Sequence, residues 1–504
     1  MEFLYLTRAI GMLLALGSVA IASHAAAVGS ADDHATLGKT ADFSSVNLSA
    51  FDVPALDFPA TTASYQVDAL QQASTAEPAV SLQQAQTWAL QSPPLQQLWQ
   101  QRRQVAQANL LQSNQRLNPQ LIVEQTGFKN TQEREASIAI AQQLDLFGER
   151  KTRQQLAGLQ LAEDGVHQLT DAAQLKLAVA VAYWQLAQAE WALQLASTQQ
   201  QLSLQALSVA KKRLQAGRIA EVDYQRVQIA HQHQLRQWQA AQTQCGLARQ
   251  QLGQFWINAM HVPNLRDIRT DQPLQWPTLE LAGLQANLAQ SPVWQAHQLQ
   301  QQQASTALQL AKIQAKPQPT FSVGYVQTRE PTAQDNAKQQ RVALGLSIPL
   351  PLFQQNQGLI QARQAVQQIN RLQVERQQQY MQQQMQQHWQ ALQAIHQQYT
   401  MVHDQQLPLS QQIQQKTLTG FEVGKFSVLE VQQASRDYQQ LQTEQLELLR
   451  QAWQLNFQLQ ALSLGLPSVD FNRENFINNF NQHIGQSALN LANDPMAGTS
   501  MDGE

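Results

Sequence analysis

The sequence repeats its own pattern of chain breaks about 200 residues further along. The paired positions are Ser92-Pro93 with Ser291-Pro292, Pro119 with Pro319, Leu146-Phe147 with Leu352-Phe353, and Gly217-Arg218 with Gly424-Lys425. The spacing between paired breaks is 199, 200, 206 and 207 residues, and its one large change falls in the polar stretch 329–340, where a longer loop disturbs least. Matched breaks at a nearly constant spacing indicate a duplicated unit, so two structural repeats are expected instead of unrelated domains.

Each half contains a stretch in which apolar residues alternate with small or polar ones. In the second half this stretch is Arg341–Leu350, and in the first half it is Ser137–Leu144. A half-buried strand of a soluble protein gives the same pattern. The second copy favours barrel strands that lie between lipid and an aqueous lumen.

Two strand hairpins are therefore expected, over 120–128 with 136–146 and over 320–327 with 341–350. Their apolar faces are predicted to contact lipid. The residues on those faces are Ile138, Ile140, Phe321, Val323, Tyr325, Val342, Leu344, Leu346 and Ile348.

Each hairpin runs directly into a long helical segment. Residues 148–216 contain no proline, and their apolar residues recur about every 3.5 positions, the period of helices that pack as coiled coils. An unbroken helix of this length would extend on the order of 100 Å. Gly217 suits the end of that helix, and a return helix is expected from near 220 to 252. Pro408 predicts a kink in the second copy.

The remaining segments are defined by targeting and composition. Residues 1–27 are typical of a secretory signal peptide, with Arg8 before an apolar run. Residues 28–79 are expected to form an extended arm and 467–504 a polar tail. The first repeat is placed at 81–256, a connecting equatorial segment at 257–277, and the second repeat at 278–466. No later stretch is long and apolar enough for a membrane-spanning helix.

Composition argues against several classes of protein. The net charge of −3 gives no basic bias, so no nucleic-acid partner is expected. The single cysteine, Cys245, cannot form an internal disulfide. No phosphate loop, nucleophile elbow, HExxH or paired-cysteine motif is present, and no enzyme and no cofactor are predicted.

Histidine spacing argues against a metal site. His388, His396 and His403 share a helix face, but each gap is roughly 11 Å along the axis, too long for one ion. His231 and His233 point to different faces of their helix. Solvated or packed histidines are expected in both sets.

Four strands cannot close on themselves, and unpaired strand edges in lipid cost several kcal/mol for each backbone group. Two copies would form eight strands and a filled interior, whereas three copies would form twelve strands and leave an opening. Because the opposite face of the strands is small or polar, we expect a homotrimer with a water-filled channel. The predicted class is a mixed α and β membrane protein, mainly α, with a β-barrel continued by a helical barrel.

The duplicated plan resembles the TolC-type outer membrane efflux proteins over about 81–466. The residues that carry this resemblance are LNPQL, QLDLFGERK, AGRIAEVDYQRVQIA, GLSIPLPLFQQNQG and FEVGKFSVLEVQQA. Within the family, the sequence looks most like the outer membrane component of cobalt-zinc-cadmium efflux pumps. The resemblance implies a passive trimeric duct in the outer membrane and periplasm. It also implies two partners, a periplasmic adaptor and an inner-membrane pump of the resistance-nodulation-division class.

The resemblance also implies roles for residues near the two glycine turns. Glu430 matches an acidic position of the channel constriction, Gln433 stands where a second acid is expected, and Asp223 is the equivalent in the first repeat. Gly217, Arg218, Gly424 and Lys425 match the tips that contact the adaptor. Simpler interpretations are open, because acids are favoured at helix starts and glycines at helix ends.

Two other interpretations of the whole chain are open. One is a duct for drugs or for type I protein secretion, since cargo is selected mainly by the pump. The other is an exported coiled-coil scaffold or a periplasmic adaptor. The two hairpins and two strand pairs argue against this second interpretation.

Overall fold

The computed structural model describes residues 79–128, 133–256, 269–271, 275–331 and 336–466, which all belong to one unit of the chain. The expected signal peptide (1–27), nearly all of the arm (28–79), the tail (467–504) and most of the connecting segment (257–277) lie outside the described residues. The short strands β1 (Ala79–Val80) and β4 (Arg269–Thr270) pair in parallel.

The helices follow the repeated breaks of the sequence. In the first half they are α2 (Leu82–Leu90), α3 (Pro93–Ser113), α4 (Glu149–Gln215), α5 (Glu221–Gly253) and the 3₁₀ turn Gln254–Trp256. In the second half they are α6 (Leu281–Gln290), α7 (Pro292–Gln314), α8 (Gln357–Thr400), α9 (Leu407–Glu422) and α10 (Val428–Ser463). No helix of the described part is both long and apolar enough to cross a membrane.

Local chemistry explains where the shorter helices begin. Ser81 forms a capping box with Gln84, in which each side chain accepts a hydrogen bond from the other residue's backbone N–H. Pro93 and Pro292 occupy the first helical position of α3 and α7, where the missing N–H costs nothing.

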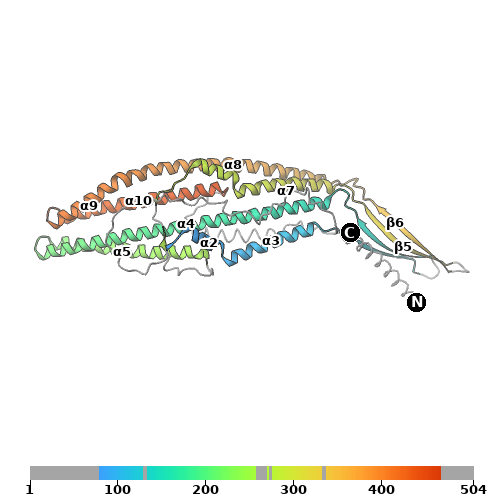
Figure 1. Cartoon of the computed structure of the whole chain (residues 1–504), viewed down its shortest axis with the longest axis horizontal. Helices are drawn as coiled ribbons and strands as arrows, with labels where there is room; N and C mark the ends of the chain where they lie inside the picture. Colours follow the sequence, from blue (N-terminus) through green and yellow to red (C-terminus); the bar gives the residue numbers. More distant parts are fainter. Residues whose placement is uncertain (1–78, 129–132, 257–268, 272–274, 332–335, 467–504) are drawn as a thin grey trace, which may run out of the picture. The chain divides into compact units, whose positions relative to one another are not determined.

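The long helix α4 packs against helices of both halves, namely α2, α3, α5, α7 and α10 (Figure 1). Its best-buried segment includes Trp184, which is 7% exposed and lies 6.1 Å, centroid to centroid, from both Trp453 and Phe457 of α10. Trp184 is therefore a packing residue that joins the two halves.

Glutamine amides also connect the two halves. Gln199 of α4 donates to Gln442 of α10 at 2.9 Å, and Gln234 of α5 donates to Gln439 of α10 at 3.1 Å. Glu163 of α4 accepts hydrogen bonds from Gln300 and Gln303 of α7. The glutamine-rich composition thus supplies side chains that both donate and accept between packed helices.

The second long helix is interrupted near Pro408, as expected. A π-helical segment, Met401–Gln406, separates α8 from α9, and Pro408 lies in the first turn of α9. Because proline has no N–H to donate, the preceding turn loses a backbone hydrogen bond and adopts a wider path.

The four strands form one antiparallel sheet in the order β2-β3-β5-β6. They are β2 (Gln120–Thr126), β3 (Arg134–Gln143), β5 (Thr320–Pro331) and β6 (Asn336–Ser347). The strands of the second hairpin extend further into the loop than the sequence predicts, to a pairing of Pro331 with Asn336. The strands β2 and β6 each have one edge without a partner among the described residues.

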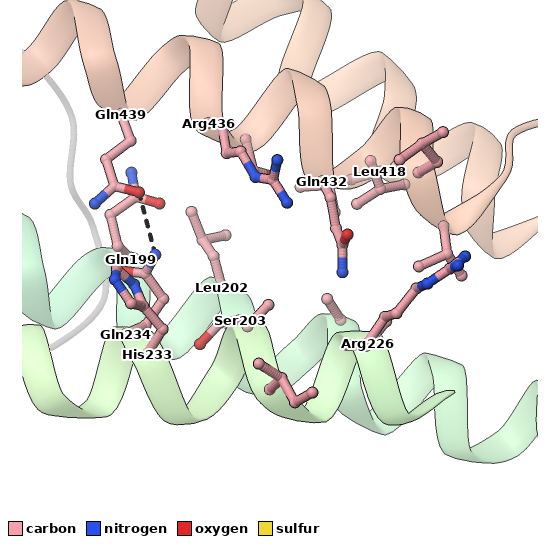
Figure 2. Close-up of a pocket in the computed structure, with 18 of the residues that line it drawn as sticks. Gln199, Leu202, Ser203, Arg226, His233, Gln234, Leu418, Gln432, Arg436 and Gln439 are labelled. Carbon is pink, nitrogen blue, oxygen red and sulfur yellow. Dashed lines mark hydrogen bonds between the residues drawn. The ribbon is translucent and has the colours of Figure 1, made fainter. Parts of the chain in front are cut away.

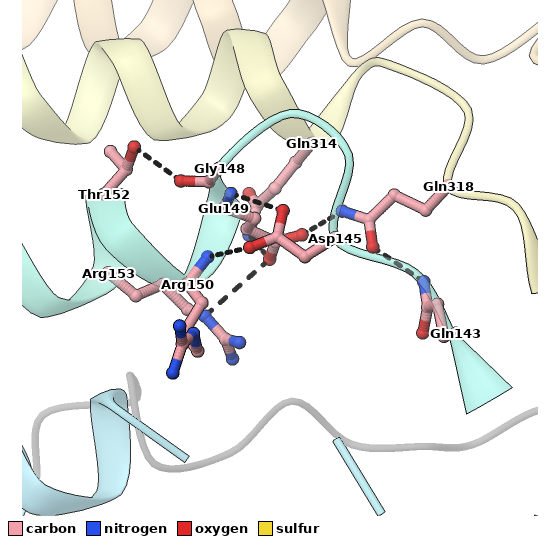
Figure 3. Close-up of polar contacts among 9 residues, drawn as sticks. All are labelled: Gln143, Asp145, Gly148, Glu149, Arg150, Thr152, Arg153, Gln314 and Gln318. Carbon is pink, nitrogen blue, oxygen red and sulfur yellow. Dashed lines mark hydrogen bonds and ion pairs between the residues drawn. The ribbon is translucent and has the colours of Figure 1, made fainter. Parts of the chain in front are cut away.

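A polar cluster fixes the passage from β3 into α4 (Figure 3). The Asp145 carboxylate accepts hydrogen bonds from the backbone N–H groups of Glu149 and Arg150, at 2.7 and 2.9 Å. Burial raises the pKa of Asp145, but these hydrogen bonds outweigh it and hold the pKa below its usual value. Gln318, which precedes β5, donates to Glu149 and accepts from Gln143 of β3. The cluster ties both hairpins to the start of α4.

Candidate functional site

The turns at Gly217 and Gly424 have the same backbone geometry. Their φ angles are 66° and 88°, in the left-handed region that glycine adopts without strain. The N–H of Arg218 donates to the Arg213 carbonyl at 2.8 Å, and the N–H of Lys425 donates to the Gly420 carbonyl at 2.7 Å. Both turns are thus Schellman motifs, which accounts for the glycines without any binding role.

The turns of the two halves pack against each other. Their shared core consists of the buried residues Ala210, Val227, Phe421, Val428 and Val431, drawn from α4, α5, α9 and α10. The Arg213 guanidinium donates to the Phe421 carbonyl at 3.1 Å, and its central carbon lies 4.6 Å from the Phe421 ring centroid. The two predicted tips therefore form one contiguous region.

Glu430 completes a capping box at the start of α10. Its carboxylate accepts from the Ser427 backbone N–H at 2.7 Å and from the Ser427 hydroxyl at 2.8 Å. These hydrogen bonds, the backbone one first, hold the pKa of Glu430 below its ordinary value. Glu430 is therefore a helix-capping anion in the single chain, the simpler interpretation left open by the sequence.

Asp223 and Gln433 also have partners on their own helices. Asp223, in the first turn of α5, accepts from Arg226 at 3.2 Å. The Gln433 amide donates to Asp437 at 2.8 Å. No hydrogen bond between described residues joins Asp223 to Glu430, so within one chain these positions form no carboxylate cluster.

The strand register brings the predicted lipid-facing residues onto one face of the sheet. Residues directly opposite one another share a face. The opposed sets are Ile138 with Tyr325 and Val342, Ile140 with Val323 and Leu344, and Phe321 with Leu346. Val342 and Leu344 are 74% and 70% exposed. Ile348 follows β6 directly, one residue beyond its end at Ser347.

Residues of β2 extend this apolar face beyond the predicted set. Leu121 lies opposite Ile140, and Val123 lies opposite Ile138. The alternate face carries Ala139, Gly324 and Ala343 in one cross-strand row, and Ile122 of β2 extends that row. One face of the sheet is thus apolar and exposed across all four strands. The other is mostly small or polar, with Ile122 and Val326 as its larger apolar residues.

The histidines lie among aromatic and hydroxyl neighbours. The ring of His396 is 4.7 Å from that of Trp276, and the ring of His403 is 5.2 Å from that of Tyr399. The Nδ1 atom of His231 lies 2.9 Å from the Ser203 hydroxyl. No cluster of three histidine, cysteine, aspartate or glutamate ligands occurs among the described residues.

A groove of about 750 Å³ lies beside the joined turns, between α4, α5, α9 and α10 (Figure 2). Apolar residues of all four helices line it, including Leu202, Ile229 and Leu418. Arg226 of α5 and Arg436 of α10 supply the charge.

Comparisons with known proteins bear on the fold. No family model matches the sequence. The cobalt-zinc-cadmium resistance protein CzcC of Cupriavidus metallidurans is 26% identical over 268 residues. The match covers 52% of this chain and 60% of CzcC, less than two thirds of that relative.

Solved structures match over most of their length. CusC, described for its transmembrane channel formation, is 19% identical with a TM-score of 0.60, and the match covers 77% of this chain and 92% of CusC. The outer membrane protein VceC of Vibrio cholerae is 14% identical with a TM-score of 0.60, covering 77% and 97%. The chain has the TolC-type outer membrane channel fold.

The TolC-type fold confirms the resemblance inferred from the repeated motifs, and with it a mainly helical chain that carries one small sheet. The matched proteins are channels and a resistance protein, in agreement with the expectation that the chain is not an enzyme.

Sequence reasoning did not identify three residues of this region, namely Arg213, Phe421 and Arg436. The available signals were weak. Arg213 is a cation in the last turn of a helix, a common position for one. Phe421 and Arg436 lie in ordinary helical periodicity. Phe421 contacts Arg213, 208 positions away in sequence, and Arg436 lines a groove between four helices, so only the packing of those helices reveals them.

Proposed function

We propose that this chain is the outer membrane channel subunit of a tripartite efflux system. The observation that carries the proposal is the sheet. It has one exposed apolar face across four strands, and at both β2 and β6 an edge without a partner in the described part of the chain. Lipid covers such a face, and further strands satisfy such edges.

Three copies satisfy both requirements together. Twelve strands close the sheet and leave a lumen lined by the small face, whereas eight strands would need bulky inward side chains to fill the interior. The side chains of Ala139, Gly324 and Ala343 are too small to fill the interior of an eight-stranded barrel. The channel is therefore a homotrimer whose helices continue the wall into the periplasm.

The partners are those that the resemblance to TolC-type efflux proteins implies. The helix α4 begins just after strand β3 and ends at the turn of Gly217 and Arg218, which packs against the turn of Gly424 and Lys425. These joined turns are the proposed contact with the periplasmic adaptor. An inner-membrane pump of the resistance-nodulation-division class supplies the energy. The channel itself is a passive duct without a cofactor.

Threefold symmetry would bring three copies of Glu430 together, with Gln433 and Asp223 nearby, at a constriction of the duct. A ring of three carboxylates favours cations. In the single chain Glu430 is an exposed helix cap. Ser427 donates to only one of its carboxylate oxygens, so the other oxygen can still face cations in a constriction.

Heavy-metal cations of the cobalt, zinc and cadmium type are the proposed cargo, supported by the similarity to CzcC, a cobalt-zinc-cadmium resistance protein. The fold is shared with the outer membrane protein VceC of Vibrio cholerae, and fold alone does not select this cargo over drugs or secreted proteins.

Gene deletion with complementation tests the proposal. Loss of the gene is expected to lower tolerance to zinc, cobalt or cadmium, and the intact gene is expected to restore it. Unchanged metal tolerance together with raised antibiotic sensitivity would instead support a drug duct. Unchanged tolerance to both would contradict an efflux role.

A further inference from the structure

The groove between the two helical hairpins combines an apolar lining with unbalanced positive charge. Among the described residues that line it, none is acidic, and two are arginines, Arg226 and Arg436. Figure 2 shows Gln432 and Arg436 extending from α10 towards α4 and α5. The groove therefore disfavours cations, including the proposed metal cargo.

The two arginines differ in their own contacts. Arg226 is paired with Asp223 at 3.2 Å, and both side chains are substantially exposed, at 60% and 36%. Arg436 is exposed and forms no hydrogen bond or ion pair with any described residue, while Asp437, next in sequence, accepts from Gln433. A guanidinium at the wall of an apolar groove, with no carboxylate to balance it, is a site for an anion.

The remaining lining sets the shape of the occupant. The apolar residues are Leu202, Ala206, Val227, Ile229, Ala230, Leu418, Phe421, Val428, Leu429 and Val431. A volume of about 750 Å³ lies within the usual range for a small organic ligand, and such sites combine mostly apolar walls with a few polar groups.

We propose that this groove binds a small anionic amphiphile, with its apolar body along α4, α5 and α9 and its acidic head at Arg436, within reach of Arg226. Gln432 and Gln439 of α10 offer further amide donors near the head. Because the arginines come from α5 and α10, one ligand would join the hairpin of the first repeat to that of the second. The site does not depend on the cargo or on trimer formation.

The test uses the full chain in a non-ionic detergent, with a photoreactive long-chain fatty acid as the probe. Crosslinked peptides are mapped by mass spectrometry, so probe dissolved in the detergent does not interfere. Labelling is expected in α5 and α10, and the matching fatty alcohol should label the same peptides weakly.

Three variants separate recognition of the acidic head from nonspecific binding of the probe to apolar surface. The double variant R226Q/R436Q is expected to reduce labelling by the acid about tenfold or more, since a hydrogen bond to a charged group contributes roughly 1.5–3 kcal/mol. The single variant R436Q should show most of this loss. The control R376Q removes an exposed arginine of α8 that is outside the groove, and should leave labelling unchanged.

The opposite results would overturn the inference. Equal labelling by acid and alcohol would mean an apolar surface without an anion site. Labelling spread evenly along the chain, or full labelling of R226Q/R436Q, would exclude this groove as the site. Melting by far-ultraviolet circular dichroism, expected to be unchanged in the variants, checks that they remain folded.

Discussion

The Arg213 side chain of α4 reaches the end of α9, donating to the Phe421 carbonyl at 3.1 Å while its guanidinium lies over the Phe421 ring. This carbonyl belongs to the last turn of α9 and also accepts from the Gly424 N–H at 3.1 Å, so Arg213 binds its second acceptor position. Arg213 thus holds the two turns together by a hydrogen bond and a cation–π contact at once.

Replacing Arg213 by alanine should loosen the second turn. A hydrogen bond from a charged donor contributes roughly 1.5–3 kcal/mol, and an exposed cation–π contact roughly 0.5–1 kcal/mol. Amide hydrogen exchange measured by mass spectrometry should accelerate in 418–431. The neighbouring substitution Lys212→Ala removes an exposed cation without these contacts and should leave exchange in that segment unchanged. Equal acceleration in both variants would contradict a specific role for Arg213.

Two substitutions separate the capping role of Glu430 from the proposed constriction. Glu430→Gln keeps a side chain that suits a capping box but removes the charge, whereas Ser427→Ala breaks the box and keeps the charge. In planar bilayers, Glu430→Gln should lower the cation selectivity of the channel, and Ser427→Ala should not. If selectivity is unchanged in Glu430→Gln, Glu430 is a cap alone.

Acid should fray the start of α10. The folded-state pKa of Glu430 lies below its ordinary value of 4.5 because Ser427 donates to the carboxylate. The cap is therefore complete above that value and is lost as the pH falls through the lower folded-state pKa. Hydrogen exchange in 427–431, corrected for its intrinsic pH dependence, should show lost protection in this range. Glu430→Gln should remove the pH dependence of that protection.

A buried ion pair joins α3 to α4. Arg102 and Asp171 are 2.8 Å apart with side chains 5% and 9% exposed, and Trp99 also donates to Asp171. Burial raises the pKa of Asp171, and Arg102 opposes that rise. Arg102→Leu should cost roughly 3–5 kcal/mol, because it leaves a carboxylate buried without its partner. The double variant Arg102→Leu with Asp171→Leu should recover most of this in chemical unfolding, and no recovery would contradict the explanation.

The two faces of the sheet should respond differently to charge. Arginine at Leu344 would lie in lipid, at a cost of about 2–4 kcal/mol near the bilayer midplane. Arginine at Ala343, the next residue, would lie in the lumen. Leu344→Arg should reduce the amount of chain recovered in the outer membrane fraction, and Ala343→Arg should not. The reverse order would mean that the faces are assigned the wrong way round.

Features fixed by neighbouring residues could be predicted from the sequence. The capping box at Ser81 and the turns at Gly217 and Gly424 depend on hydrogen bonds within a few residues, so composition and spacing are sufficient. Strand alternation correctly predicted which side chains share a face, because cross-strand partners follow the same period of two.

Features that depend on packing between the two halves of the chain could not be predicted. From sequence alone, Phe421 is an ordinary apolar helical residue and Arg436 an ordinary surface cation. Only the packed structure shows that Arg213 lies over the Phe421 ring and that Arg436 lines a groove. The extension of β5 and β6 was also missed. The polar stretch 329–340 lacks alternation, so its sequence does not indicate the pairing of 329–331 with 336–338.

The number of chains in one channel tests the central claim most directly. Native mass spectrometry of the full chain, extracted from outer membranes in non-ionic detergent, should give the mass of three copies, because twelve strands satisfy the edges of β2 and β6. A single copy, with both edges left unpaired in detergent, would contradict the account.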